Sequence, residues 1–167
     1  MNKIDGSKRV MDIFLEICQI PRPSGHEEKM GEYLMNFASA RGLKYLKDDV
    51  GNVVIFKPAT PGYENRQTVI LQAHQDMVCE KEATLDHDFM TQPISTYVED
   101  GWLKARGTTL GADDGIGIAL ALALLDSSEI EHGPLECLFT VSEETGLIGA
   151  TQLKPGMMNG KMLINLD

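Results

Sequence analysis

The sequence is poor in basic side chains and has no long apolar run, and each shortage excludes a class of protein. It contains 15 lysines and arginines against 25 aspartates and glutamates, which gives a formal net charge of −10. Binding to phosphate groups needs a basic face, so nucleic acid is not an expected partner. The most apolar stretch, residues 116–125, is too short to cross a bilayer, so no membrane association is expected.

Cysteines are also few, and they indicate the cellular compartment. Cys18, Cys79 and Cys137 are widely spaced and form no C-x-x-C pair. Cys18 and Cys137 lie in apolar runs, which predicts thiols in the core rather than zinc ligands. The first ten residues, MNKIDGSKRV, contain no apolar segment of the signal-peptide type. We therefore expect a reducing compartment, the cytoplasm.

Motifs for nucleotides and for calcium are missing. The glycines of GADDGIG do not match G-x-G-x-x-G, and the two aspartates would repel a pyrophosphate. The DHDF stretch lacks the ligand spacing of a calcium loop. What remains is the composition of a globular domain, with 43% hydrophobic and 24% charged residues. A chain of 167 residues can form one domain with a sizeable core.

Hydrophobic periodicity predicts helices that alternate with strands. The expected helices cover residues 7–18, 24–41, 115–127 and 147–153. The expected strands form a hairpin around residues 50–52 and continue with residues 68–73, 94–98, 102–106, 135–141 and 161–166. This alternation predicts an α/β domain whose mixed, mainly parallel sheet lies between helices.

Two local features refine the expected helices. Ser24 and Glu27 have the S-x-x-E spacing of a capping box, which predicts that the second helix starts there. The helix over residues 115–127 is apolar nearly all round, so we expect it to be buried at the centre of the domain.

Acidic or imidazole side chains follow the buried segments at four places. These are His74 with Asp76, Asp113 with Asp114, Glu143 with Glu144, and Asp167. In open α/β sheets the carboxyl ends of the strands meet at one edge, where ligands bind. One histidine and several carboxylates at that edge would repel one another unless a cation lay among them. Mixed nitrogen and oxygen ligands suit zinc, and also manganese or cobalt.

Each of these groups also has a simpler interpretation. His74 and Asp76 could form a hydrogen-bonded pair, and Asp113 with Asp114 could cap a helix. Glu143 with Glu144 could form a charged turn, and an aspartate at position 167 carries no signal alone. The metal interpretation rests on all four groups occupying the same kind of position.

Five stretches of the sequence together resemble the M20 family of di-metal peptidases. In order, they are AHQDMV, RGTTLGADDGIG, HGPLE, TVSEETGLIGA and INLD. The pattern H-x-D is weak alone, whereas H-x-D, G-A-D-D-G, E-E-x-G and L-D in this order are specific. The sequence is most similar to the aminoacyl-histidine dipeptidase branch. The resemblance implies a three-layer zinc-exopeptidase-like catalytic domain.

The resemblance also implies two divalent metal ions, zinc first and manganese or cobalt as alternatives, and it assigns roles. His74, Asp113 and Asp167 would hold the first metal, and Asp113 would bridge to a second metal held by Glu144. Asp76 would orient His74, and Glu143 would act as the general base. The peptide bond between Asp113 and Asp114 is expected to be cis.

The implied reaction is the metal-dependent hydrolysis of dipeptides that have a free N-terminus and a C-terminal histidine. Other chemistries of the family remain alternatives, namely those of a tripeptidase, a carboxypeptidase or an amide deacylase. A further alternative is a metal-binding remnant without catalysis. The partners implied are a dipeptide substrate and, for a full-length protein, a second copy in a homodimer.

Family members of this branch are longer by a factor of two or more. They carry an inserted lid and dimerisation domain and a returning segment that completes the catalytic domain. Residues 1–167 are therefore expected to form the N-terminal portion of that domain, with an exposed sheet edge that invites self-association. Because the second metal would have only Asp113 and Glu144, we expect one well-held metal and little or no hydrolysis by this chain alone.

Overall fold

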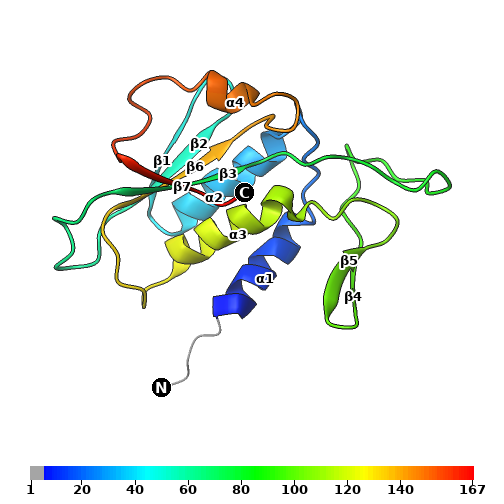
Figure 1. Cartoon of the computed structure of the whole chain (residues 1–167), viewed down its shortest axis with the longest axis horizontal. Helices are drawn as coiled ribbons and strands as arrows, with labels where there is room; N and C mark the ends of the chain where they lie inside the picture. Colours follow the sequence, from blue (N-terminus) through cyan, green and yellow to red (C-terminus); the bar gives the residue numbers. More distant parts are fainter. Residues whose placement is uncertain (1–5) are drawn as a thin grey trace.

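The computed structural model describes residues 6–167 and contains a central five-stranded sheet (Figure 1). Its strands lie in the order β1-β2-β6-β3-β7. They are β1 (Lys44–Lys47), β2 (Val53–Lys57), β3 (Val69–His74), β6 (Leu135–Thr140) and β7 (Met162–Asn165). The neighbours β6, β3 and β7 run parallel, whereas β2 is antiparallel to β1 and β6. The predicted mixed sheet, with its hairpin and parallel core, is confirmed.

The parallel strands end at one edge of the sheet. His74 pairs in register with Thr140, and Gln72 pairs with Asn165. The residues that follow β3, β6 and β7 therefore leave the sheet side by side, although they are far apart in the sequence. This arrangement positions the site described below.

Three helices cover one face of the sheet. They are α1 (Gly6–Ile17), α2 (Glu28–Ala40) and α3 (Ala112–Asp126). Their apolar faces pack in one core with the inner side chains of β2, β3 and β6, and Ile13, Leu34 and Ile118 are completely buried there. The predicted core thiols Cys18 and Cys137 are both buried.

The opposite face carries a thinner layer. Val54, Ile70 and Leu138 form a second small cluster, which packs beneath Leu153 and Met157. The helix on this side, α4 (Ile148–Thr151), is shorter than predicted. Helical layers therefore lie on both sides of the sheet, as expected for the three-layer class, but they differ in depth (Figure 1).

The helix α3 begins irregularly. Asp113 and Asp114 have non-helical backbone angles, so the regular helix starts at Gly115, where the sequence predicts it. The peptide bond between the two aspartates is cis, as the family resemblance implies. This irregular start carries the two carboxylates out of the helix and beside the end of β3.

The predicted capping box is wrong. Helix α2 starts at Glu28, and neither Ser24 nor Glu27 makes a capping hydrogen bond. Ser24 instead donates a hydrogen bond to Asp76, and the Glu27 carboxylate accepts hydrogen bonds from Ser142. These long-range partners, which local spacing does not reveal, replace the local cap.

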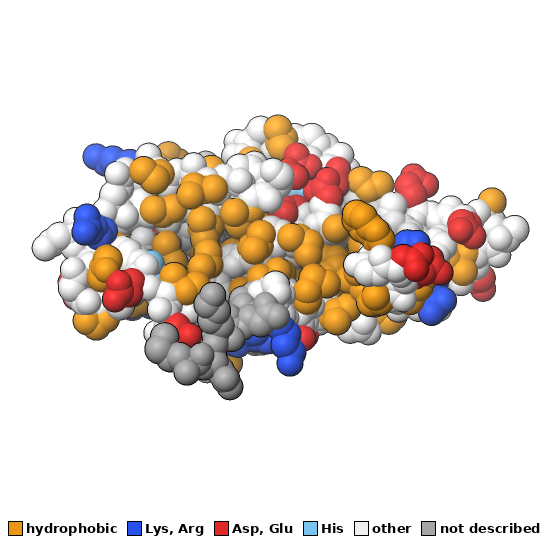
Figure 2. All heavy atoms as spheres, turned by 60° about the horizontal axis from the view of Figure 1, so that its bottom comes forward, with side chains coloured by type: hydrophobic (Ala, Val, Ile, Leu, Met, Phe, Trp, Pro, Cys, Tyr) orange, Lys and Arg blue, Asp and Glu red, His pale blue; other side chains and the backbone are white. Residues whose placement is uncertain are grey.

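The burial expected for the third helix is only partly correct. Its inner face is buried, but Leu120 on the outer face is 39% exposed. Figure 2 shows the side of the molecule on which α1 and α3 lie, with hydrophobic side chains gathered across its middle. Met11 and Leu15 of α1 are among the large hydrophobic side chains that are exposed.

The remaining elements lie at the periphery. A separate hairpin, β4 (Thr96–Glu99) with β5 (Trp102–Ala105), forms where two short strands are predicted. All four residues of β7 are exposed, and this edge strand pairs only with β3 among the described residues. Over residues 6–167 no helix combines the length and the apolar character that a membrane span needs.

Candidate metal centre

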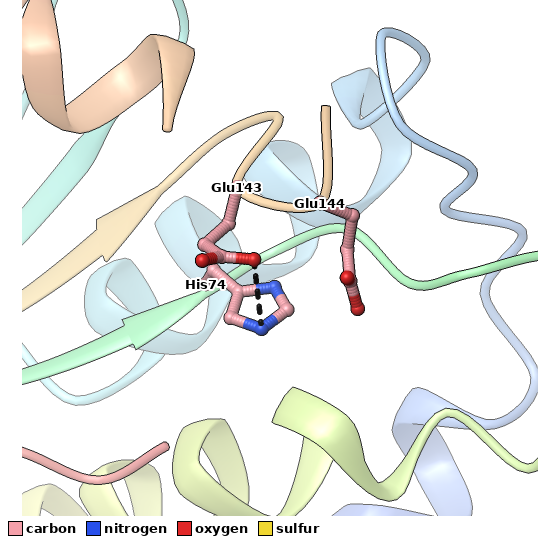
Figure 3. Close-up of side chains that lie close together, drawn as sticks. All are labelled: His74, Glu143 and Glu144. Atoms are coloured by element: carbon pink, nitrogen blue, oxygen red, sulfur yellow. Dashed lines mark ion pairs between the residues drawn. The ribbon is translucent and has the colours of Figure 1, made fainter. Parts of the chain in front are cut away.

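The end of β3 brings His74 into a cluster of carboxylates. The ring is 1% exposed, and its Nε2 atom lies 2.9 Å from Asp113 Oδ1. The same nitrogen lies 3.9 Å from Asp167 Oδ2 and 4.0 Å from Glu143 Oε2. Figure 3 shows Glu143 over the ring and Glu144 to one side of it, both on the loop after β6. Three separate segments therefore supply side chains to one imidazole.

Two groups of side chains have the spacing that a metal ion needs. One consists of His74, Asp113 and Asp167, and the other of His74, Glu143 and Glu144. Within each group the candidate ligand atoms lie within 4.8 Å of one another. The first group is the set that the resemblance implies for the first metal. The second joins the expected base, Glu143, to Glu144 around the same histidine.

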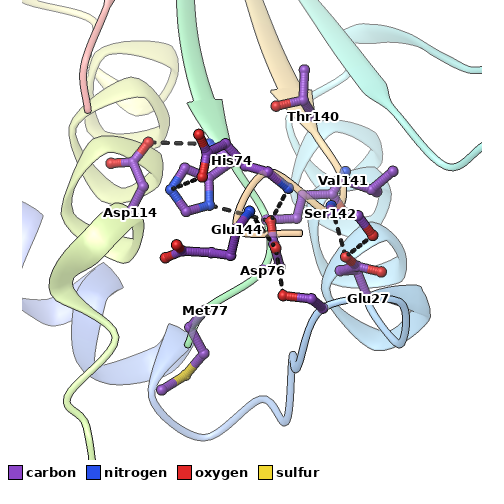
Figure 4. A network of polar contacts seen from close by, with 12 residues as sticks. Glu27, His74, Asp76, Met77, Asp114, Thr140, Val141, Ser142 and Glu144 are labelled. Carbon is purple, nitrogen blue, oxygen red and sulfur yellow. Dashed lines mark hydrogen bonds and ion pairs between the residues drawn. The ribbon is translucent and has the colours of Figure 1, made fainter. Parts of the chain in front are cut away.

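Asp76 lies behind the imidazole and is completely buried. Its Oδ1 atom is 3.2 Å from Nδ1 of His74 and accepts the backbone N–H of Glu143 at 3.0 Å. Its Oδ2 atom accepts hydrogen bonds from the Ser24 hydroxyl at 2.7 Å and from the Glu144 N–H at 3.2 Å. Figure 4 shows this carboxylate between the ring and the loop that carries Glu144. Asp76 thus holds both the histidine and the two glutamates.

Asp114 is also buried, but it binds backbone instead of facing the cluster. Its Oδ2 accepts the N–H of His74 at 3.0 Å, and its Oδ1 accepts the N–H of Gly117 at 3.0 Å. The second contact is the helix-capping function considered as an alternative for this aspartate. Burial raises the pKa of Asp114 to about 6, against the opposing effect of these hydrogen bonds.

The pKa values of His74 and its partner Asp76 are both strongly shifted. Burial alone would lower the pKa of this imidazole, but hydrogen bonds to Asp76 and Asp113 outweigh it and raise the pKa to about 9. Burial likewise opposes the charge on Asp76, yet its hydrogen bonds to His74 and Ser24 lower the pKa to about 2. Both pKa shifts favour the ionised pair, an imidazolium beside a carboxylate.

The other carboxylates are open to solvent to different degrees. The side chain of Asp113 is 68% exposed, that of Asp167 is 36% exposed and that of Glu143 is 27% exposed. Burial, followed by the charge of Asp113, raises the pKa of Glu144. The cluster therefore combines a buried, fixed histidine with acids whose oxygens a ligand can reach.

This donor set fits a divalent cation. An imidazole nitrogen and carboxylate oxygens are ligands for zinc, manganese or cobalt. A ligating histidine usually has its other ring nitrogen bound to a carboxylate, and Asp76 occupies that position here. The six residues predicted for the site, His74, Asp76, Asp113, Glu143, Glu144 and Asp167, all lie together, whereas their individual roles remain predictions.

The sequence did not reveal a further set of residues that supports the site. Arg22, Ser24, Glu27 and Ser142 surround it and bind its loops. The local spacing of Ser24 and Glu27 predicts only a capping box. Arg22 lies between two prolines, and no local pattern connects it with residues 50 or more positions away. Their contacts become visible only in the folded chain.

Comparison with known proteins agrees with this geometry. Residues 70–165 match the family model described as peptidase family M20/M25/M40. The chain is 51% identical, over 156 residues, to the cytosol non-specific dipeptidase of Escherichia coli (strain K12). This match covers 93% of the chain and 32% of that relative.

Solved structures show the same similarity. The crystal structure of aminoacylhistidine dipeptidase from Vibrio alginolyticus superposes with a TM-score of 0.92 and 49% identity, covering 94% of this chain and 32% of that one. A tripeptidase from Staphylococcus aureus gives a TM-score of 0.80 and 27% identity, covering 96% and 43%. The chain thus spans about a third of the length of the two dipeptidases. With more than half of its residues matched by the family model, the chain belongs to peptidase family M20/M25/M40.

Proposed function

We propose that this chain carries the metal site of a metal-dependent dipeptidase that cleaves dipeptides with a C-terminal histidine. The observation that carries the proposal is the buried His74, which faces carboxylates from separate segments while Asp76 holds its other nitrogen. Membership of a peptidase family supports hydrolysis of a peptide bond. Zinc is the proposed metal, with manganese and cobalt as alternatives.

The proposed first site consists of His74, Asp113 and Asp167, and Asp113 would be shared with a second site at Glu144. Metal bound there would lower the pKa of water and polarise the carbonyl of the scissile bond. Because metal binds neutral imidazole, binding would release the proton that His74 holds at neutral pH. Asp76 would then accept a hydrogen bond from Nδ1–H and leave the Nε2 lone pair facing Asp113 and Asp167.

Glu143 is the proposed general base. Its carboxylate lies beside the His74 ring and is partly exposed, so both water and substrate can reach it. It would take a proton from the attacking water and later deliver that proton to the leaving amine. The backbone N–H of Glu143, bound to Asp76, fixes the start of this side chain.

The names of the relatives support the substrate class. The Vibrio structure is an aminoacylhistidine dipeptidase, and the Escherichia coli relative is a non-specific dipeptidase. Cleavage of Xaa-His dipeptides and a cytoplasmic location are therefore proposed for the whole protein. A homodimer is a further proposal, which rests on the family resemblance alone. The three free cysteines agree with a reducing compartment.

We further propose that residues 1–167 are the N-terminal portion of the catalytic domain and lack part of the second site. Asp113 and Glu144 are two ligands, whereas a catalytic zinc usually has three protein ligands. On this count the chain alone binds one metal well and hydrolyses little or nothing.

The direct test is a calorimetric titration of the chelator-stripped chain with zinc, followed by an assay for histidine released from Xaa-His dipeptides. We expect one site in the wild-type chain and none in His74→Ala. The matched control is His132→Ala, because His132 precedes the opposite end of β6 and its ring contacts the carbonyl of Gly133, far from the site. This control should bind zinc as the wild type does.

Other results would change the proposal in defined ways. No zinc binding by the wild-type chain, or equal binding by His74→Ala, would contradict the assignment of the site. Two sites would show that Glu144 has a further ligand, and hydrolysis should then be measurable. Binding without hydrolysis in a longer form of the protein would favour a metal-binding remnant.

A further inference from the structure

We infer that the segment at residues 22–27, which links α1 to α2, is a positioning element for the metal site. It contacts the loop after β3, the start of α3 and the loop after β6, and it contributes no candidate ligand. This inference rests on the proposed metal function. A segment that only connected two helices would not need these contacts, and positioning of the metal site explains them.

Arg22 joins two of the loops. Arg22 is 2% exposed, and its Nη1 donates hydrogen bonds to the carbonyls of Gln75 at 3.0 Å and Asp76 at 2.7 Å. Its Nη2 donates to the carbonyl of Gly111, two residues before Asp113. A buried charge is costly unless its donors are paired, so these contacts select one placement of the two loops. Arg22 thereby sets the spacing between the ends that carry His74 and Asp113.

Two glycines leave room for this guanidinium. A Cβ atom at Gly111 would lie 2.7 Å from Nη2 of Arg22, and one at Gly115 would lie 2.9 Å from the same nitrogen. Both glycines belong to the GADDG stretch around Asp113 and Asp114. The stretch is therefore shaped to receive Arg22 as well as to present its carboxylates.

Ser24 and Glu27 fix the third loop. The Ser24 hydroxyl donates to Asp76, whose carboxylate accepts the N–H groups of Glu143 and Glu144. Oε1 of Glu27 accepts the N–H of Ser142 at 2.8 Å and its hydroxyl at 2.9 Å. Figure 4 shows Glu27 facing Ser142 at one side of the network, with Asp76 near its centre.

The conformation of Ser142 explains why this loop needs an anchor. Its φ angle is +50°, in the left-handed region that non-glycine residues rarely adopt. Such a conformation persists only where surrounding contacts hold it, and Glu27 supplies two of those contacts to Ser142. Because Ser142 directly precedes Glu143, this anchor sets where the two glutamates point.

The test compares Ser24→Ala with wild type in two measurements. The first is amide hydrogen exchange by NMR in the chelator-stripped chain, where we expect exchange at Glu143 and Glu144 to become about 10-fold faster. The second is zinc affinity, which should fall about 10- to 100-fold, as is typical for residues that support metal ligands. The absorption spectrum of bound cobalt should change as well.

Matched variants separate positioning from a general loss of stability. Ser24→Thr keeps the hydroxyl and should restore zinc affinity to near the wild-type value. Ser39→Ala removes a hydroxyl that binds only Met35 on α2, and it should change neither measurement at the site. Arg22→Lys keeps the charge but not the forked geometry, and it should lower zinc affinity at least as much as Ser24→Ala.

The inference is overturned if Ser24→Ala leaves exchange at Glu143 and Glu144 unchanged. It is also overturned if the variant loses only thermal stability and keeps zinc affinity and the cobalt spectrum. A wild-type chain that does not bind zinc would instead contradict the proposed function. In that case the exchange measurement, which needs no metal, still decides whether residues 22–27 position the loop.

Discussion

Two buried carboxylates, Asp76 and Glu136, lie at opposite ends of the central sheet. Glu136, near the start of β6, is 4% exposed and accepts hydrogen bonds from the backbone N–H groups of Asn159 and Gly160. Asp76, just after β3, accepts two backbone N–H groups as well, but it also binds an imidazole. Both carboxylates accept hydrogen bonds, which offset the free-energy cost of removing their oxygens from water.

The difference between them lies in what their partners leave free. Among the described residues, the hydrogen bonds to the Glu136 carboxylate all come from the loop at Asn159 and Gly160, and neither residue offers a ligand atom to another site. Asp76 binds His74 through one ring nitrogen, so the other nitrogen faces Asp113 and Asp167. Burial of an acid is therefore not itself a sign of function. Function is indicated when the acid binds a residue such as His74, whose second nitrogen remains available and faces other possible metal ligands.

The largest expected effect concerns Asp76. Asp76→Ala leaves the imidazole and two backbone N–H groups without their acceptor, so the free energy of unfolding should fall by about 3–5 kcal/mol. Urea denaturation of the chelator-stripped chain measures this loss. If Asp76→Ala cost no more than removing the charge of Glu136, the two carboxylates would be equivalent and the comparison would fail.

The next effect compares two glycines. Gly117→Ala places a Cβ against the Asp114 carboxylate, and Gly160→Ala places one 2.7 Å from Cγ1 of Ile70. Each should cost about 1–3 kcal/mol of stability through overpacking. Only Gly117→Ala should also weaken zinc binding, because Asp114 holds the N–H of His74. Equal zinc affinities measured by calorimetry would contradict this expectation.

A smaller effect is expected at Glu136 itself. Glu136→Gln keeps one acceptor oxygen but loses the charge that strengthens the hydrogen bonds to Asn159 and Gly160. Stability in urea should fall by about 1–2 kcal/mol. Zinc affinity should stay at the wild-type value, and a decrease would mean that this end of the sheet is coupled to the site.

The smallest effect concerns an acid near the surface. Burial would raise the pKa of Asp126, but Arg41 and Arg9 outweigh it and lower the pKa. A lowered pKa stabilises the fold above about pH 4, and this stabilisation disappears as the pH falls through the folded value. Asp126→Asn should therefore cost about 0.5–1 kcal/mol near pH 7 and nearly nothing near pH 2. Thermal unfolding at both pH values measures the difference.

The sequence contained enough information to predict the sheet and the residues that meet at its edge. Period and composition identified β3, β6 and β7, and parallel strands bring their ends together without further information. His74 ends the buried strand β3, and Glu143 follows the buried strand β6. Asp113 lies at the start of the apolar helix α3, and Asp167 follows β7, which is exposed. The local sequence pattern was sufficient to predict which side chains meet, because parallel strands place their carboxyl ends at the same edge of the sheet.

The supporting contacts could not be predicted, for a physical reason. Ser24 and Glu27 have the spacing of a capping box, and nothing local shows that Asp76 and Ser142 bind them instead. The same holds for the exposed side of α3, whose apolar residues predicted a buried helix although Leu120 is exposed. Local propensity is weak, and tertiary contacts decide between its alternatives.

The parallel pairing of β3 and β6 also determines when the site forms during folding. Strands that begin at Val69 and Leu135 must close a long loop, whose entropy is lost before any contact is gained. A cluster that needs both strand ends together cannot assemble early. A ligand that binds the cluster should therefore slow unfolding while leaving the refolding rate unchanged. Stopped-flow kinetics with and without zinc would show this, and faster refolding in zinc would mean that the cluster forms before the sheet.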